Sequence, residues 1–135
     1  MLLEYSHKML AWRKEVLQHE DIEAVHKMRV ALRRLRATFD AYESVCDPKQ
    51  FKKTYRRITK LADILGKARD IDVMIQNLQS QPQHVDSQAG IQWLIERLQD
   101  TRQQCQEELE AFLTQLDANS LQRQIDNCLS RAEGN

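Results

Sequence analysis

Residues 91–116, IQWLIERLQDTRQQCQEELEAFLTQL, carry the most regular pattern in the sequence. Their apolar residues recur in steps of four and three, the spacing that places side chains on one face of an α-helix. Such a seam is typical of a helix that packs at a shallow angle against others in a bundle. The seam consists of Ile91, Ile95, Leu98, Arg102, Cys105, Leu109, Phe112 and Leu116.

One member of this seam is an arginine, Arg102, and two interpretations of it are open. Its aliphatic stem could pack in the bundle while the guanidinium reaches water, as is usual for long cationic side chains. Alternatively, Arg102 could point into a polar interior lined by cations.

The composition favours an all-α fold for the whole chain. Its 135 residues suit a single domain, 1–135, and three glycines, two prolines and 6% aromatic residues leave little material for a turn-rich β fold. We predict an antiparallel bundle of about four helices, followed by a short fifth segment. The predicted helices cover residues 2–18, 21–44, 49–78, 88–116 and 121–131, with Asp21 as a helix cap and Asp47 and Pro48 as a helix stop.

Several classes of protein lack their signatures here. No secretory leader and no run of about 20 apolar residues is present, so we expect a cytoplasmic protein without a membrane span. Cys46, Cys105 and Cys128 are far apart and form no C-x-x-C pair, which argues against a disulfide framework or a zinc knuckle. No phosphate-binding glycine loop or Ser/His/Asp arrangement is visible. We therefore expect a binding protein without a cofactor, not an enzyme.

Charge is distributed unevenly along the chain although the formal net charge is zero. Residues 1–70 contain 16 Lys or Arg against 10 Asp or Glu, whereas residues 71–135 contain 4 against 10. An asymmetry of this kind predicts a basic face for an anionic partner.

The stretch 24–39, AVHKMRVALRRLRATF, concentrates these cations and contains no acidic residue. On a helical wheel its apolar residues form one stripe, and a set of cations lies beside that stripe instead of opposite it. Cations in this position could face a neighbouring helix across a groove, whereas Lys27 and Arg34 lie elsewhere on the wheel and look more solvated. The stripe is Met28, Ala31, Leu32, Leu35, Phe39 and Tyr42, and the flanking cations are His26, Arg29, Arg33 and Arg36.

The next predicted helix repeats the theme. Its apolar stripe is accompanied by a broad cationic face made of Lys53, Arg56, Arg57, Lys60 and Lys67. Two successive basic helices with few local acids favour an anion-binding groove, and arginine suits phosphate because its guanidinium offers planar, bidentate donors.

Two segments resemble the conserved histidine α-helical domain family, abbreviated CHAD. VHKMRVALRRLRATF (25–39) is similar to the family's His-x-x-Arg-Val-x-x-Arg-Arg-x-Arg helix, and LADILGKARDIDVMI (61–75) to its Leu-Gly-x-x-Arg-Asp-x-Asp-Val segment. The resemblance implies a helical module that binds inorganic polyphosphate in a basic groove, in association with polyphosphate granules. By position it implies phosphate contacts from His26, Arg29, Arg33, Arg34, Arg36 and Arg69.

Our own stripe argument adds Lys53, Arg57, Lys60 and Lys67 to this candidate site. We expect Asp70 and Asp72 to orient the arginines or to cap helices. Family members commonly contain two pseudo-symmetric halves, and this chain is long enough for one. A single half could form a shallower groove, or two chains could rebuild the symmetric site, and we predict a homodimer.

Two alternative functions compete with polyphosphate binding. Nucleic-acid backbones also reward basic stripes, but an exposed aromatic platform and a convincing helix-turn-helix are missing from the sequence. Glu4-x-x-His7 and Glu23-x-x-His26 have the spacing found in di-iron bundles, yet arginines that would repel a dication surround His26.

Overall fold

The computed structural model describes residues 2–19, 21–82, 84–116 and 118–133, and most of these residues are helical with no β-strand among them. The prediction of an all-α fold is confirmed. The elements in chain order are α1 (Leu2–Leu10), α2 (Arg13–Gln18), α3 (Glu23–Asp40), α4 (Pro48–Ser80), the 3₁₀ turn η1 (Val85–Ser87), α5 (Gln88–Gln115) and α6 (Ala118–Glu133).

The largest departures from the predicted helix boundaries lie in the first two predicted helices. The first predicted helix is broken, because the Trp12 N–H bonds to the Met9 carbonyl three residues back and the chain turns there. Met9 and Val16, on either side of this turn, are both fully buried. The second difference is that α3 ends at Asp40, four residues before the predicted end.

Aspartates fix the starts of the two helices that matter most for the site. The Asp21 carboxylate accepts a hydrogen bond of 2.9 Å from the N–H of Glu23, the first residue of α3, although the residue directly before α3 is Ile22. Asp47 caps α4 by accepting from the Gln50 N–H at 3.3 Å, with Pro48 as the first helical residue. From there α4 continues for 33 residues, through Gly66, without interruption.

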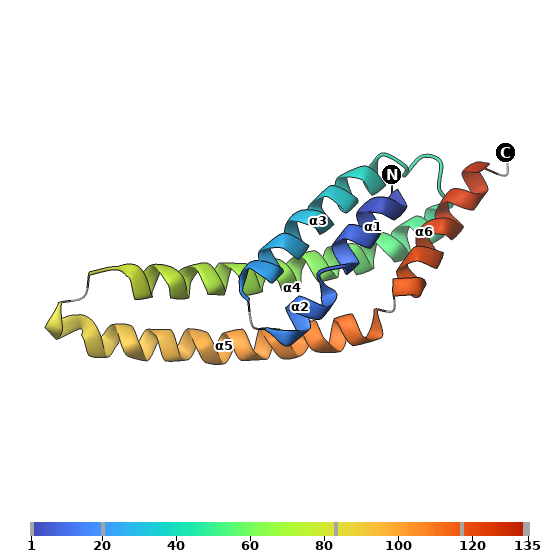
Figure 1. Cartoon of the computed structure of the whole chain (residues 1–135). Coiled ribbons are helices and arrows are strands. Elements are labelled where there is room, and N and C mark those ends of the chain that lie inside the picture. The colour runs from blue at the N-terminus through green and yellow to red at the C-terminus, as the bar shows by residue number, and fades with distance from the viewer. Residues whose placement is uncertain (1, 20, 83, 117, 134–135) are drawn as a thin grey trace.

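The two longest helices, α4 and α5, form an antiparallel hairpin to which the other helices are added at one end (Figure 1). Helices α1, α2, α3 and α6 cover the first part of α4 and the last part of α5. The remainder of the hairpin, around residues 72–100, projects beyond them as a two-helix arm (Figure 1). A bundle end and a projecting arm therefore share the same two helices.

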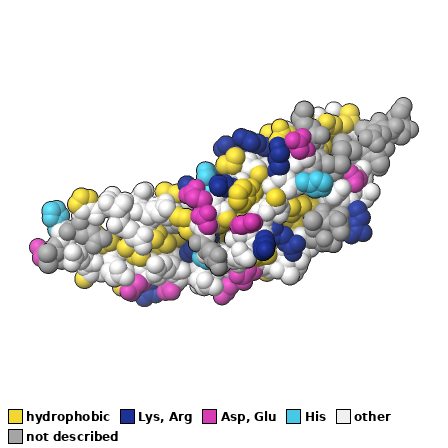
Figure 2. Space-filling model, in the orientation of Figure 1, with side chains coloured by type: hydrophobic (Ala, Val, Ile, Leu, Met, Phe, Trp, Pro, Cys, Tyr) yellow, Lys and Arg dark blue, Asp and Glu magenta, His cyan; other side chains and the backbone are white. Residues whose placement is uncertain are grey.

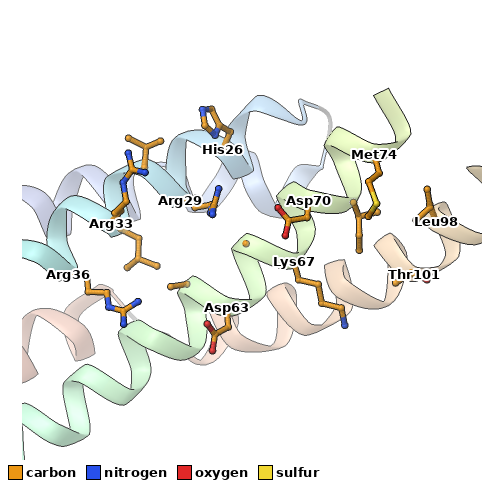
Figure 3. A pocket seen from close by; sticks show the side chains of 15 residues that line it. His26, Arg29, Arg33, Arg36, Asp63, Lys67, Asp70, Met74, Leu98 and Thr101 are labelled. Atoms are coloured by element: carbon orange, nitrogen blue, oxygen red, sulfur yellow. The ribbon is translucent and has the colours of Figure 1, made fainter. Parts of the chain in front are cut away.

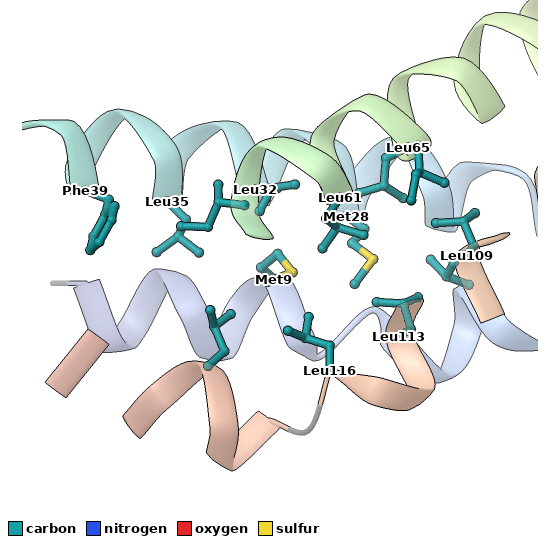
Figure 4. Packing of buried hydrophobic residues seen from close by; sticks show 14 of the residues in the cluster. Met9, Met28, Leu32, Leu35, Phe39, Leu61, Leu65, Leu109, Leu113 and Leu116 are labelled. Atoms are coloured by element: carbon teal, nitrogen blue, oxygen red, sulfur yellow. The ribbon is translucent and has the colours of Figure 1, made fainter. Parts of the chain in front are cut away.

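The hydrophobic core lies at the bundle end, where α1, α3, α4, α5 and α6 meet. The predicted stripe of α3 is buried: Met28, Leu32, Leu35 and Phe39 are at most 1% exposed. Figure 4 shows them against side chains of α1, α4 and α5. Full burial of one such side chain contributes about 1.5–3 kcal/mol to folding, so this cluster fixes how α3 lies against α4. The fully buried members from the other helices include Met9, Leu61, Leu65, Leu109, Leu113 and Leu116.

Arg102 follows neither interpretation offered by the sequence, because it is only 3% exposed and is paired. Its Nε donates to Asp72 Oδ1 at 2.9 Å, and its Nη1 donates to Gln106 Oε1 at 3.0 Å. Gln106 in turn donates to the Val16 carbonyl at 3.0 Å, which ties α2 to α5 and α4. Arg102 neither reaches water nor joins a cation-lined interior, and Asp72 orients this arginine instead of one from the basic motifs.

Candidate functional site

A groove of about 790 Å³ lies between α3 and α4, and side chains of α5 close one end of it (Figure 3). We call it the α3–α4 groove. Its cations outnumber its acids, since four Lys or Arg and one His face two aspartates. Its lining is His26, Arg29, Val30, Leu32, Arg33, Arg36, Ala62, Asp63, Gly66, Lys67, Asp70, Ile71, Met74, Leu98 and Thr101.

The cations that α3 contributes are the ones that its helical period predicts. His26, Arg29, Arg33 and Arg36 follow steps of three, four and three, and all of them line the groove. Arg29 and Arg33 are exposed, and neither forms an ion pair with any carboxylate in the part of the chain that the structure describes. Two guanidinium groups are therefore available to a ligand in the groove.

Arg36 is held in place by an aromatic cluster. Its Nε donates a hydrogen bond of 3.0 Å to Tyr55 Oη, and its guanidinium carbon lies 5.3 Å from the centroid of the same ring. The Tyr55 ring stacks on Phe51, which stacks on buried Phe39, with centroid distances of 5.5 and 4.6 Å. The hydrogen bond that Tyr55 accepts raises the pKa of Arg36, and together with the ring contact it holds this permanently charged guanidinium at one end of the groove.

The wall that α4 contributes is mixed in charge. Lys67 lies between Asp63 and Asp70, each about one helical turn away on the same side of α4. Gly66 lies opposite Arg29, and a Cβ at Gly66 would lie 3.7 Å from Arg29 Nε. The absence of a side chain at Gly66 leaves space in the groove beside Arg29. An anion in the groove would therefore meet attractive charge along α3 and carboxylates along α4.

The structure does not bring the remaining predicted site residues into this groove. Arg34 lines a second groove on the other flank of α3, and Lys53 is exposed on α4 away from both. Arg57 donates to Gln124 Oε1 of α6 at 2.8 Å, and Lys60 lies 5.9 Å from the Phe112 ring. Arg69 pairs with Glu23 at 3.4 Å. Of the cations predicted from the stripe on α4, Lys67 is the one that joins the α3 set.

His26 lies between the α3–α4 groove and the second groove on the other flank of α3. It lines both of them, and its Nδ1 atom is buried without a hydrogen-bond partner among the described residues. Figure 3 shows the side chain near the start of α3, at one end of the row of arginines. A ligand that runs along α3 would pass it.

The sequence did not indicate Asp63 or the anchor of the groove, and Asp63 lies among α4 cations that a count of basic residues brings to the fore. Asp70, which we expected to orient an arginine or to cap a helix, lines the groove and forms no ion pair with an arginine among the described residues. The Tyr55 ring packs with the apolar side of α4, and its hydroxyl accepts a hydrogen bond from a side chain 19 positions earlier. No pattern within one helix could have indicated that contact.

The E-x-x-H pairs have other contacts. Glu4 pairs with Lys8 at 3.0 Å, His7 forms a hydrogen bond with Gln122 at 3.2 Å, and Glu23 pairs with Arg69. Within the described ranges no group of three or more His, Cys, Asp or Glu side chains is placed to hold a metal ion. The three cysteines are buried and unbridged, as small core residues would be.

A comparison with known protein families identifies the family to which the chain belongs. The sequence model of the CHAD domain matches residues 1–135. The chain belongs to the CHAD-domain family. No curated protein and no solved structure matches it. In this CHAD domain the two motifs that carried the resemblance face each other, since the histidine–arginine motif lies on α3 and Gly66 of the second motif lies opposite Arg29. A search of the described residues finds no helix that is long and apolar enough to cross a membrane.

Proposed function

We propose that this CHAD domain binds inorganic polyphosphate in the α3–α4 groove and that it is a binding protein, not an enzyme. The observation that carries the proposal is the pair of unneutralised arginines, Arg29 and Arg33, beside the fixed charge of Arg36. Unpaired cations that are held close together raise the energy of the free protein. A multivalent anion removes that cost.

The shape of the groove supports a linear phosphate polymer. From His26 to Arg36 the row of cations extends about 15 Å along α3, at a rise of about 1.5 Å per residue. Guanidinium groups donate bidentate hydrogen bonds to phosphate oxygens. Asp63 and Asp70 on the α4 wall would hold the polymer against α3 by repulsion.

Nucleic acid is the second candidate ligand, because its backbone presents similar charges. The described lining of the α3–α4 groove contains no Phe, Tyr or Trp on which a base could stack. Polyphosphate has no base to accommodate and suits this lining better.

Titration with long-chain polyphosphate, with DNA as competitor, tests the proposal at several salt concentrations. We expect Arg29→Ala/Arg33→Ala to weaken polyphosphate binding by tenfold or more, because two charge-assisted hydrogen bonds are lost at about 1.5–3 kcal/mol each. Lys49→Ala/Lys52→Ala is the matched control, since these exposed α4 lysines line neither groove. Equal loss in both double variants, or equal affinity for DNA, would overturn the proposal.

We further propose that two chains associate through the projecting arm of α4 and α5. Three large apolar side chains are exposed there, namely Met74 at 45%, Trp93 at 58% and Leu94 at 40%. Met74 also lines the α3–α4 groove, so a second copy on the arm would extend the groove. Sedimentation velocity should show a dimer that Trp93→Asp/Leu94→Asp dissociates. A wild-type monomer with and without polyphosphate would contradict this proposal.

Polyphosphate binding also suggests a location, and we propose that the protein is cytoplasmic and associates with polyphosphate granules. A fluorescent fusion should follow the granules, and Arg29→Ala/Arg33→Ala should disperse it. A wild-type fusion that ignores granules would count against this location.

A further inference from the structure

A second basic groove lies on the opposite flank of α3, where the turn between α1 and α2 approaches it. It has a volume of about 520 Å³, and we call it the α1–α3 groove. Its charged lining consists of Lys8, Lys27 and Arg34 with one carboxylate, Glu15. Like the first groove, it has more cations than acids.

The two cations that α3 itself contributes to this groove are available to a ligand. Lys27 and Arg34 are exposed, and the described residues supply neither of them with an ion-pair partner. The Lys27 ammonium lies 4.9 Å from the ring centroid of Trp12, which positions it at the side of the groove. Lys8 differs, because it already pairs with Glu4 at 3.0 Å.

The two grooves adjoin each other across α3. His26 and Val30 line both of them, and no acidic residue occurs on α3 between residues 24 and 39. A polyanion that follows Arg36, Arg33 and Arg29 toward the start of α3 therefore meets His26 next and then Lys27. The carboxylate at this end of α3, Glu23, is paired with Arg69. The buried Nδ1 atom of His26 has no partner among the described residues.

We propose that the α1–α3 groove is a second phosphate-binding surface, which receives the part of a long polyphosphate chain that extends past His26. This inference rests on the proposed function, since it requires the α3–α4 groove to hold the first part of the chain. It adds Lys27 as a ligand contact, and it places Arg34, which the family resemblance already implied, on a separate wall. It also predicts that the protein distinguishes long chains from short ones.

The first test compares charge reversal in the second groove with a matched control. We expect Lys27→Glu/Arg34→Glu to weaken long-chain polyphosphate by about tenfold or more relative to Lys49→Glu/Lys52→Glu, which changes the charge equally outside both grooves. Tripolyphosphate, which the first groove can hold alone, should bind both double variants equally. Circular dichroism should show equal helix content for the two.

The second test uses Trp12 as a local reporter. The chain has two tryptophans, and Trp93 is 58% exposed on the projecting arm, so Trp93→Phe leaves Trp12 as the single emitter. Long-chain polyphosphate should change the Trp12 emission at the concentrations at which it binds, whereas tripolyphosphate should leave it unchanged.

The outcomes separate this inference from the proposed function. If long chains bind through Arg29 and Arg33 while Trp12 emission stays constant and Lys27→Glu/Arg34→Glu equals its control, the second surface is refuted and the proposed function stands. If tripolyphosphate and long chains lose equal affinity in Lys27→Glu/Arg34→Glu, the effect is general electrostatics and the second surface is also refuted. If the wild type binds no polyphosphate, both proposals fail.

Discussion

The arginine of the bundle interior and the arginines of α3 show two uses of the same side chain. Arg102 is 3% exposed, with a carboxylate 2.9 Å from its Nε. Arg29 and Arg33 are exposed, and no carboxylate in the described chain pairs with them. A carboxylate of the protein neutralises the buried cation, whereas the exposed cations remain available to a ligand. This difference predicts which substitutions affect stability and which affect binding.

The largest loss of stability is expected when the buried pair is broken. Asp72→Ala leaves the Arg102 guanidinium buried without its carboxylate, and removal of one partner of a buried pair costs about 3–5 kcal/mol. Urea unfolding followed by circular dichroism measures the free energy of unfolding. A loss below about 1 kcal/mol would mean that water hydrates the Arg102 guanidinium in solution or that another carboxylate pairs with it.

A double variant separates the contribution of the ion pair to stability from the contribution of the packing around it. Asp72→Leu/Arg102→Met removes both charges, and exchange of a buried ion pair for apolar groups is often neutral or stabilising. We therefore expect it to be more stable than Asp72→Ala, although Gln106 Oε1 loses its Arg102 donor in the double variant.

A smaller effect on stability is expected at Tyr55, which holds Arg36 in place at one end of the α3–α4 groove. Tyr55→Phe keeps the ring that stacks on Phe51 but removes the hydroxyl that accepts from Arg36 Nε. We expect a loss of about 0.5–1.5 kcal/mol in the free energy of unfolding, the usual contribution of one hydrogen bond. Polyphosphate affinity should also fall, because Arg36 loses its fixed orientation. Unchanged affinity would show that Arg36 does not need this anchor.

The periodicity of single helices predicted the fold class and the α3 side of the candidate site. Steps of three and four placed His26, Arg29, Arg33 and Arg36 on one flank of α3, and the structure brings them together in one groove. That prediction works because the buried stripe of a helix fixes the direction of its other faces. The all-α class followed from the same regularity, especially in α5.

Contacts between helices could not be predicted in this way. The pattern of α5 marks Arg102 as a seam position, but its partner Asp72 lies 30 residues earlier on α4. The predicted cationic face of α4 is present. Which neighbouring helix each of its cations contacts depends on how α4 and α5 pair in the hairpin. Arg57 therefore meets α6, and Lys67 alone of the stripe reaches the groove. The turn at Trp12 likewise depends on the burial of Met9 and Val16.

A pH-dependent effect is expected beside the buried pair. His19 ends α2 in the left-handed conformation, with φ of 52°, and burial followed by the nearby Arg102 charge lowers its pKa from the usual 6.5. The unfolded chain therefore binds a proton that the folded chain rejects, so stability falls as the pH drops below about 6.5. His19→Asn suits the same backbone and should reduce the drop in melting temperature between about pH 7.5 and about pH 5.5. An identical drop in both proteins would assign the acid sensitivity to other groups.

The smallest effect on stability is expected where the largest effect on binding is proposed. Arg29 and Arg33 are four residues apart on an exposed helix face, and like charges at this spacing destabilise a helix by about 0.2–0.5 kcal/mol. Arg33→Ala removes that repulsion and introduces the residue with the best helix propensity, so the free energy of unfolding should stay constant or rise slightly. Urea unfolding without ligand measures this change, and polyphosphate titration of the same protein measures the loss of affinity. A loss of stability above about 1 kcal/mol would instead mean that Arg33 has partners within the fold, as Arg102 has, and that its weakened binding reflects structure. Stability retained with affinity lost is the combination that only an unneutralised, ligand-facing arginine can give.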